Sequence, residues 1–402
     1  MNKMAEDLVS IKSINIKNYK SIVDTTIQLG GFNVFIGANG CGKSNILEAI
    51  ALGAAASDNK VHFEYFANRG IRITDPYLMF PRFSKDKIDK IIISLIDSMG
   101  KSSSYYILSD DNDTSPTKIK VLKDSDLNAE IKEKINNNEI DLREWLSAIF
   151  QKQSDSQIKV DNEYKNISID IRQDFEHITI MPITILHSFL IYSLEESKLR
   201  QADASNRIYP LGNHGEGLFS YLKEISKREN AVGFFNELKE NLSVFDWFDD
   251  IEIPNGQLSN EFNIVLKDSY LDETLSAFDQ RSTNEGFLYL LFYLTLIISD
   301  ETPKFFAIEN IDSSFNPKLC REVIKRLIVL AQKHGKQIIA TTHNPSVLDG
   351  LDLNDDSVRL FTIRRGIDGD TKASRVTLKD QLTIPLSEAW QRGYLGGLPD
   401  NF

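Results

Sequence analysis

A short stretch near the start of the chain has the residue types and the spacing that bind phosphate. Residues 37–44 read Gly-Ala-Asn-Gly-Cys-Gly-Lys-Ser, which matches the pattern G-x-x-x-x-G-K-[ST]. Glycine lets the backbone curl until its N–H groups point at phosphate oxygens, because no Cβ stands in the way. In this pattern Lys43 reaches the β- and γ-phosphates, and Ser44 offers its hydroxyl to Mg²⁺. The spacing therefore predicts a site for ATP and Mg²⁺.

The residues on either side of this stretch supply the elements that the pattern requires. Phe32–Ile36 is an apolar run of strand length, and Asn45–Leu52 repeats apolar residues at helical spacing. A helix that begins near Lys43 adds the positive end of its dipole to the loop. A glycine-rich turn is the alternative interpretation, but it leaves Lys43 and Ser44 unexplained. Strand, loop and helix together favour nucleotide binding.

Composition and charge narrow the classes of protein to consider. The chain has 402 residues, of which 41% are hydrophobic, and this length predicts one large domain with insertions or two domains. The net charge of −12 argues against a generally basic DNA-coating protein, although a local basic groove would not be visible in that total. The chain has two cysteines, Cys41 and Cys320, which predicts a reducing cytoplasm.

The sequence predicts neither a signal peptide nor a membrane span. Residues 1–7 contain no apolar core of the kind found in signal peptides. The longest apolar run, Phe287–Ile298, is too short to span a bilayer and indicates a buried helix. We therefore expect a soluble, cytoplasmic protein with no membrane partner.

The second half of the chain places polar residues at the ends of predicted strands. Residues 304–308 predict a buried strand that ends in Glu309 and Asn310, and residues 337–342 predict another that ends at His343. A helix predicted at residues 317–334 joins these strands. Strand, helix and strand with short links imply a parallel sheet with right-handed crossovers. The carboxyl ends of such strands meet at the edge where ligands bind.

The remaining segments predict short strands and helices. Early strands at 14–17 and 24–29 flank a turn, where Tyr19 either stacks on adenine or packs under the sheet. The glycine loop 211–217 has no Lys-Ser pair and is interpreted as the entry to a helix at 218–225. Further predictions are strands at 88–96, 104–108, 118–122, 166–171, 177–186, 251–253 and 262–266, helices at 126–153 and 234–248, a strand end or helix start at 188–199, a turn at 109–116, a polar loop beside a ligand at 200–206, a hairpin of strands 358–363 and 374–378, and a segment 385–402 that either docks a partner or packs on the core. No heptad pattern of a long coiled coil is visible.

Five pieces of the sequence, taken in order, resemble the motifs of ABC-type ATPases. They are the phosphate loop 37–44, a signature-like segment 282–286, the acidic strand end 305–310, the segment 312–316 that follows, and Thr342-His343. The compact intracellular, SMC-like branch is the most similar. Within it the chain resembles the ATPase domains of overcoming-lysogenization-defect (OLD) nucleases and the related AAA ATPases of bacterial phage-defence operons. That similarity lies in segments 16–22, 37–45 and 341–345.

The resemblance implies an α/β fold, that of a P-loop NTPase with ABC-ATPase topology. A mixed, mainly parallel sheet flanked by helices would carry an antiparallel β lobe and an inserted helical and β region. The expected parts are an N-terminal ATPase lobe at 1–60, the inserted region at 61–275 and a C-terminal ATPase lobe at 276–402. The glutamine that links the lobes in such ATPases could not be placed.

The resemblance also implies roles for the residues at the two strand ends. Glu309 would hold the water shell of Mg²⁺, together with Ser44. Asn310 stands where a catalytic glutamate normally polarises the attacking water, and because asparagine is not a base, turnover is expected to be weak. Asp312 is the candidate substitute, acting through a water molecule. His343 matches the switch histidine that contacts the γ-phosphate.

A site shared between two subunits follows from the same resemblance. Asn284, Glu285 and Gly286 would cap the γ-phosphate of an opposing subunit, so ATP binding and dimerisation would be coupled. Taken singly, Glu309 could be a solvated strand end, His343 a loop histidine, and residues 282–286 a helix N-cap. The full set of predicted nucleotide-binding residues is Asn39, Gly40, Cys41, Gly42, Lys43, Ser44, Asn45, Asn284, Glu285 and Gly286.

Three functions remain open at this point. The first is an ATP-gated homodimer, or a higher homo-oligomer, that regulates a separate effector such as a nuclease or toxin in antiphage defence. It is favoured because no room is expected after the last strand for the nuclease domain of OLD enzymes. The second is an SMC-like ATPase that processes or repairs DNA and binds it. The third is the cytosolic subunit of a transporter.

Overall fold

The centre of the protein is a six-stranded sheet in the order β14-β13-β3-β12-β11-β7. The computed structural model describes residues 9–58, 60, 63–72, 74, 76–81, 90–109, 119–123, 184–201, 210–253, 264–271, 277–278, 282–377 and 384–398. All neighbouring strands of this sheet run parallel except the antiparallel pair β13 and β14. The strands are β3 (Phe32–Ile36), β7 (Ile191–Tyr192), β11 (Phe305–Ile308), β12 (Gln337–Thr341), β13 (Val358–Arg365) and β14 (Thr371–Val376).

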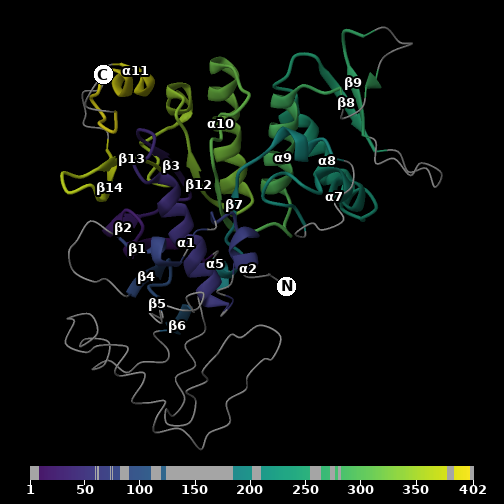
Figure 1. Cartoon of the computed structure of the whole chain (residues 1–402). Coiled ribbons are helices and arrows are strands. Elements are labelled where there is room, and N and C mark those ends of the chain that lie inside the picture. The colour runs from purple at the N-terminus through teal and green to yellow at the C-terminus, as the bar shows by residue number, and fades with distance from the viewer. Residues whose placement is uncertain are drawn as a thin grey trace, which may run out of the picture.

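Both faces of this sheet are buried, which explains why its strands are continuous apolar runs in the sequence. Side chains alternate along a strand, so Phe306 and Ile308 of β11 enter one core while Phe305 and Ala307 enter the other. The first core contains α7 (Leu218–Ile225), α8 (Ala231–Leu242), α9 (Glu285–Ile298) and α10 (Pro317–Lys333). In Figure 1, α9 and α10 lie side by side on this face.

The second core holds α1 (Lys43–Ser57) between the central sheet and an antiparallel sheet. The antiparallel sheet has the order β2-β1-β4-β5-β6. Its strands are β1 (Ile11–Tyr19), β2 (Ile22–Gln28), β4 (Lys90–Asp97), β5 (Ser102–Ser109) and β6 (Ile119–Lys123). Because α1 contacts both sheets, most of its side chains are buried and it has almost no exposed face. The two sheets therefore hold α1, and with it the residues at its start, in place.

The smaller elements surround these layers. A third sheet, in the order β10-β9-β8, consists of β8 (Phe248–Glu252), β9 (Val265–Asp268) and β10 (Ala277–Phe278). The short helices are α2 (Phe63–Ala67), η1 (Pro76–Met79), α5 (Thr184–His187), α6 (Glu196–Leu199), η3 (Pro345–Gly350) and α11 (Leu386–Gln391). In the part of the chain that the structure describes, none of the helices combines the length and apolarity needed to cross a membrane.

The predicted fold class is confirmed, and most predicted elements are present with ends shifted by a few residues. The strand predicted at 177–186 is wrong at its end, because Thr184–His187 is helical. The helix predicted at 234–248 is shorter, since α8 ends at Leu242 and Phe248 begins β8. The predictions at 126–153 and 166–171, and most of those at 109–116 and 200–206, lie outside the described residues.

Burial resolves the alternatives for Tyr19 and shows that part of the C-terminal segment packs on the core. Tyr19 is completely buried and its hydroxyl donates to Glu48 Oε2 at 3.4 Å, so it packs under the sheet and does not stack on a base. In the C-terminal segment, Ala389 and Trp390 of α11 are buried against the core. The division into parts at residues 60 and 275 stays a prediction, but β7, from the region predicted as an insertion, pairs with β11 in the central sheet.

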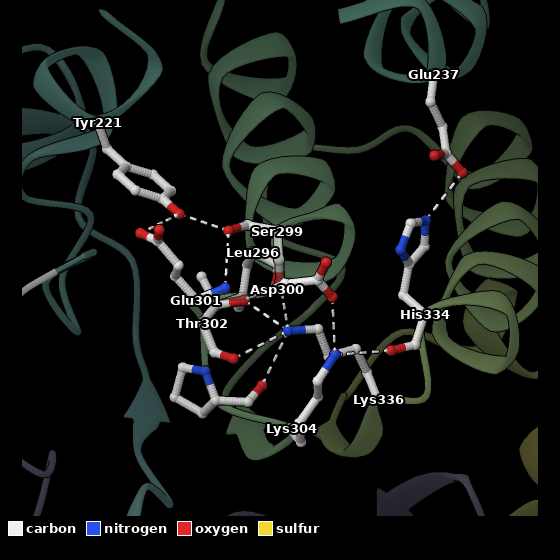
Figure 2. A network of polar contacts seen from close by, with 11 residues as sticks. Tyr221, Glu237, Leu296, Ser299, Asp300, Glu301, Thr302, Lys304, His334 and Lys336 are labelled. Atoms are coloured by element: carbon white, nitrogen blue, oxygen red, sulfur yellow. Dashed lines mark hydrogen bonds and ion pairs between the residues drawn. The ribbon is translucent and has the colours of Figure 1, made fainter. Parts of the chain in front are cut away.

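A buried lysine ties the far end of the central sheet to the end of α9. Lys336 precedes β12 and is 3% exposed. Its Nζ donates to Ser299 O at 2.7 Å, Thr302 Oγ1 at 2.6 Å, Thr302 O at 3.0 Å and Pro303 O at 3.3 Å (Figure 2). Ser299 is the C-cap of α9. Lys336 therefore joins the helix that carries residues 285 and 286 to the strand that leads to His343.

We expect Lys336 to make stability depend on pH. Burial, assisted by the charge of Lys304 and opposed by Asp300, lowers the pKa of Lys336 from 10.5 to about 7. Between these values the unfolded chain binds a proton that the folded protein does not, so the free energy of unfolding rises with pH, by at most about 1.4 kcal/mol per pH unit. Denaturant midpoints should therefore rise from pH 7 to 9 more steeply in wild type than in Lys336→Met.

The control for this experiment is Lys325→Met, which removes an exposed lysine of α10. It should keep the wild-type pH profile. If the denaturant midpoints of wild type and Lys336→Met change in parallel from pH 7 to 9, Lys336 stays protonated in the folded protein throughout this range.

Candidate nucleotide site

The phosphate loop joins the end of β3 to the start of α1. Gly42 has φ of 111° and occupies the N-cap position of α1, which begins at Lys43. A left-handed residue at this position suits glycine, because other L-residues clash with their own backbone there. Asn39 and Gly40 lie at the exposed tip of the loop, whereas Cys41 and Gly42 are buried. The predicted loop between a strand and a helix is therefore present, with its glycines in conformations that favour them.

Lys43 lies across the opening of this loop. Its Nζ donates to Gly37 O at 2.8 Å and Ala38 O at 3.2 Å. Burial lowers the pKa of Lys43 from 10.5, while the neighbouring Cys41 and Glu309 act in the opposite direction. A partly desolvated ammonium group above the loop is suited to bind a phosphate group. The phosphate oxygens would then take the place of the two carbonyl oxygens that Lys43 contacts here.

Ser44 and Glu309 are brought together from distant parts of the chain. Ser44 lies in the first turn of α1, and Glu309 directly follows β11. Ser44 Oγ donates to Glu309 Oε1 at 2.5 Å. A hydroxyl and a carboxylate side by side are the oxygen ligands that Mg²⁺ takes when phosphates and waters complete its shell. Among the described residues no cluster of three or more His, Cys, Asp or Glu could hold a metal ion. The Ser44 hydroxyl and the Glu309 carboxylate fit Mg²⁺ that is bound together with a nucleotide.

Asn310 has an unusual backbone conformation for a residue other than glycine. Its φ is 49°, and its N–H donates to Thr341 Oγ1 at 3.0 Å. Asparagine tolerates this region better than most residues because its short polar side chain can bond locally. The Asn310 residue is exposed, next to Glu309. The structure thus puts Asn310 directly after Glu309 of the predicted metal pair, and its role in turnover stays a prediction.

Asp312 and His343 follow β11 and β12, which are neighbouring strands of the central sheet. Asp312 Oδ1 accepts a hydrogen bond of 2.5 Å from Thr342 Oγ1. The backbone N–H of Thr342 in turn donates to Phe35 O near the end of β3. Partial desolvation and the charge of Lys43 lower the pKa of His343, against the effect of Asp312, and this favours the neutral imidazole. Thr342 therefore fixes one carboxylate oxygen of Asp312 at the edge of the sheet.

The signature-like residues form the start of α9. Asn284 is its N-cap, and its Oδ1 accepts from Phe287 N at 2.8 Å, as expected for a helix N-cap. A Cβ on Gly286 would lie 2.7 Å from Ser314 O, so α9 begins directly against the loop that follows Glu309. No hydrogen bond described in the structure joins residues 284–286 to the phosphate loop of the same chain. Their role as a γ-phosphate cap stays a prediction.

Arg72 is a residue of this site that no motif marks. Its Nη2 donates to Asn45 Oδ1 at 3.1 Å, and its Nε donates to Glu48 Oε1 at 2.5 Å. The hydrogen bond to Glu48 raises the pKa of Arg72, with a further contribution from the charge of Glu309. The Arg72 side chain is 63% exposed, so it adds an accessible positive charge beside the first turn of α1.

These elements define the class of protein: a P-loop ATPase in which the loop after β3 meets a carboxylate at the end of β11, a parallel strand separated from β3 by β12. Residues 32–349 match the family model described as "AAA domain, putative AbiEii toxin, Type IV TA system". The chain therefore belongs to this family. A comparison with curated proteins finds no match.

One solved structure shows the same architecture. The chain is similar to an Smc head domain with an extended coiled coil from Pyrococcus furiosus, bound to the C-terminal domain of ScpA, with a TM-score of 0.52 and 11% identity over 96% of this chain and 98% of that one. An SMC head domain from Thermotoga maritima gives a TM-score of 0.45 and 12% identity over 92% of this chain and 99% of that one. At such identities the likeness to the Pyrococcus structure shows the fold, that of an SMC-type ABC ATPase head.

Proposed function

We propose that this protein binds ATP with Mg²⁺, dimerises around the bound nucleotide, and thereby regulates a separate effector in antiphage defence. The observation that carries the nucleotide part is the contact between Ser44 and Glu309, which joins the phosphate loop to the end of β11 at 2.5 Å. Asn39–Asn45 would hold the phosphates and Ser44 with Glu309 the metal ion, whose charge offsets that of the phosphates.

The dimer part of the proposal is supported by where residues 284–286 lie. They begin α9 beside Ser314, a residue with a left-handed φ of 64°. In the described part of the chain, no hydrogen bond joins them to the phosphate loop of their own chain. A helix N-terminus attracts anions. In a second copy it would meet the γ-phosphate held by the first, so ATP would be buried by both. We therefore expect size-exclusion chromatography to detect a dimer with ATP and a monomer without it.

The regulatory part rests on the resemblance to phage-defence ATPases and on membership of a family whose description names a toxin. An effector encoded by a neighbouring gene should copurify with the ATP-bound form. An SMC-like ATPase that binds DNA is the second candidate, raised by the shared head fold. Salt-sensitive binding of the purified protein to DNA would favour it over the effector model.

Single-turnover hydrolysis tests which carboxylate acts. We expect slow turnover in wild type and no nucleotide binding in Lys43→Ala. The rate should be about 100-fold lower in Asp312→Ala, because Asp312 is a carboxylate two positions after Asn310 that Thr342 holds at the end of the strand. Asn310→Glu should raise the hydrolysis rate only slightly, because the left-handed backbone conformation at position 310 disfavours glutamate. If wild type instead binds ATP and dimerises without hydrolysis, and Asn310→Glu restores hydrolysis, the protein is a nucleotide-locked scaffold.

A further inference from the structure

The β13–β14 hairpin lies against the back of the phosphate loop. Thr371 Oγ1 donates to Cys41 O at 3.0 Å, and Arg365 Nε donates to Gly40 O at 3.0 Å. A Cβ on Gly37 would lie 2.1 Å from Ile363 O, so the start of the loop touches the hairpin as well. In Figure 1 the hairpin lies beside β3, which leads into the loop. The hairpin follows residue 349, where the family match ends.

A series of hydrogen bonds behind the phosphate loop joins Asn45, Ser21, Thr371 and Cys41 O, and its direction follows from the number of hydroxyl protons. Thr371 is completely buried, and its one hydroxyl proton is used on Cys41 O. Ser21 Oγ, 2.7 Å from Thr371 Oγ1, must therefore donate to it. Asn45 Nδ2 donates to Ser21 Oγ at 2.7 Å, and its amide orientation is fixed because Oδ1 accepts from Arg72. The chain of donors runs from Asn45 through Ser21 and Thr371 to the Cys41 carbonyl.

The last bond in this chain determines the orientation of a peptide group in the loop. In a trans peptide the C=O of one residue and the N–H of the next point in opposite directions. Because Thr371 holds Cys41 O on the hairpin side, the N–H of Gly42 points away from the hairpin. An oriented N–H at a helix N-terminus is the kind of donor that binds phosphate.

We propose that Thr371 is a positioning residue for phosphate binding, which keeps the Cys41–Gly42 peptide in the orientation that a nucleotide needs. This inference rests on the proposed nucleotide site. Without the Thr371 hydroxyl, Cys41 O has lost its buried partner, and the peptide rotates to find another. Affinity for the phosphates then falls although the apolar packing around residue 371 is unchanged.

The test compares Thr371→Val, which is close in shape but lacks the hydroxyl, with Thr371→Ser, which keeps it. ATP affinity is measured on the full chain by calorimetry without Mg²⁺, together with the unfolding midpoint of the nucleotide-free protein. We expect the Kd for ATP to rise about tenfold in Thr371→Val, the effect of one buried hydrogen bond, and to stay within about twofold in Thr371→Ser.

Two further variants separate positioning from general stability. Thr362→Val removes another buried hydroxyl of the same hairpin, which bonds Ser374 O at 3.4 Å, and should keep the wild-type Kd. Ser21→Ala breaks the donor chain one step earlier. The rise in the Kd for ATP should be smaller in Ser21→Ala than in Thr371→Val. The double variant Ser21→Ala/Thr371→Val should have the same Kd as Thr371→Val alone, because both substitutions act through the same carbonyl group.

The outcomes distinguish this inference from the proposed function. If wild type does not bind ATP, the proposed nucleotide site is wrong. If wild type binds ATP and Thr371→Val binds it equally well, the site stands and the positioning role is wrong. A tenfold loss in Thr362→Val as well, or additive losses for Ser21→Ala and Thr371→Val, would also overturn the positioning role, since either result indicates a general loss of packing.

Discussion

Glu309→Gln is expected to abolish the effect of Mg²⁺ on ATP affinity. Glu309 supplies the only charged oxygen of the pair that it forms with Ser44, and glutamine keeps its size and its acceptor for the serine hydroxyl but not its charge. Loss of one supporting carboxylate typically costs about 10–100-fold in metal affinity. Titrating ATP with and without a chelator should show a tighter Kd with Mg²⁺ in wild type and little difference in the variant.

This measurement does not depend on turnover, so the asparagine at position 310 does not complicate it. Affinity for metal-free ATP should be unchanged or slightly tighter in Glu309→Gln, because a negative charge near the phosphates has been removed. Glu322→Gln, in the exposed face of α10, is the matched control and should respond to Mg²⁺ as wild type does. A full Mg²⁺ response in Glu309→Gln would place the metal site elsewhere.

Gly42→Ala is expected to reduce ATP affinity by more than 100-fold and to lower the unfolding midpoint. The new Cβ would lie 2.1 Å from Thr371 Oγ1 and 2.8 Å from its Cγ2, at a backbone φ of 111°. Rotation of the Thr371 side chain cannot relieve this clash, because both branches lie too close and the residue is completely buried. The loop or the hairpin must move, and the peptide groups between Gly40 and Lys43 move with it.

Gly40→Ala is the matched comparison within the same loop. Gly40 also has a positive φ, 74°, but nothing lies within 4 Å of the position that a Cβ would occupy. Alanine there adds only backbone strain of about 1–2 kcal/mol, with no clash. The loss of affinity should therefore stay below about 30-fold. Equal losses in the two variants would indicate that backbone conformation, and not contact with the hairpin, makes glycine necessary at position 42.

Local patterns were sufficient to predict the layers of the fold and the strand ends at which the candidate site lies. The phosphate loop and the strands that end at Glu309 and Thr342 each have a signal within about ten residues, because periodic burial and glycine placement act over short distances. By contrast, β7 is only two residues long and has no pattern of its own. Its place beside β11 depends on contacts with a strand more than a hundred residues away.

The parts of the site that could not be predicted depend on contacts between distant residues. Thr371 and Cys41 are separated by 330 positions, and a threonine at the start of a hairpin strand resembles any other. Arg72 contacts Asn45 from a segment without regular structure, next to a short helix. Tyr19 has the residue type that stacks on a base, and only the position of α1 above it shows that it is buried. Sequence spacing does not encode such contacts.

The order of strands in the central sheet has a consequence for how the protein is made. β3, which leads into the phosphate loop, is paired on one side with β12 and on the other with β13, both of which lie about 300 residues further along the chain. During synthesis β3 leaves the ribosome long before either neighbour exists, so its edges stay unpaired until most of the chain has been translated. Nucleotide therefore cannot assist the folding of the early nascent chain. The site forms late, and a truncated product that lacks the final hairpin should be a target for chaperones and proteases.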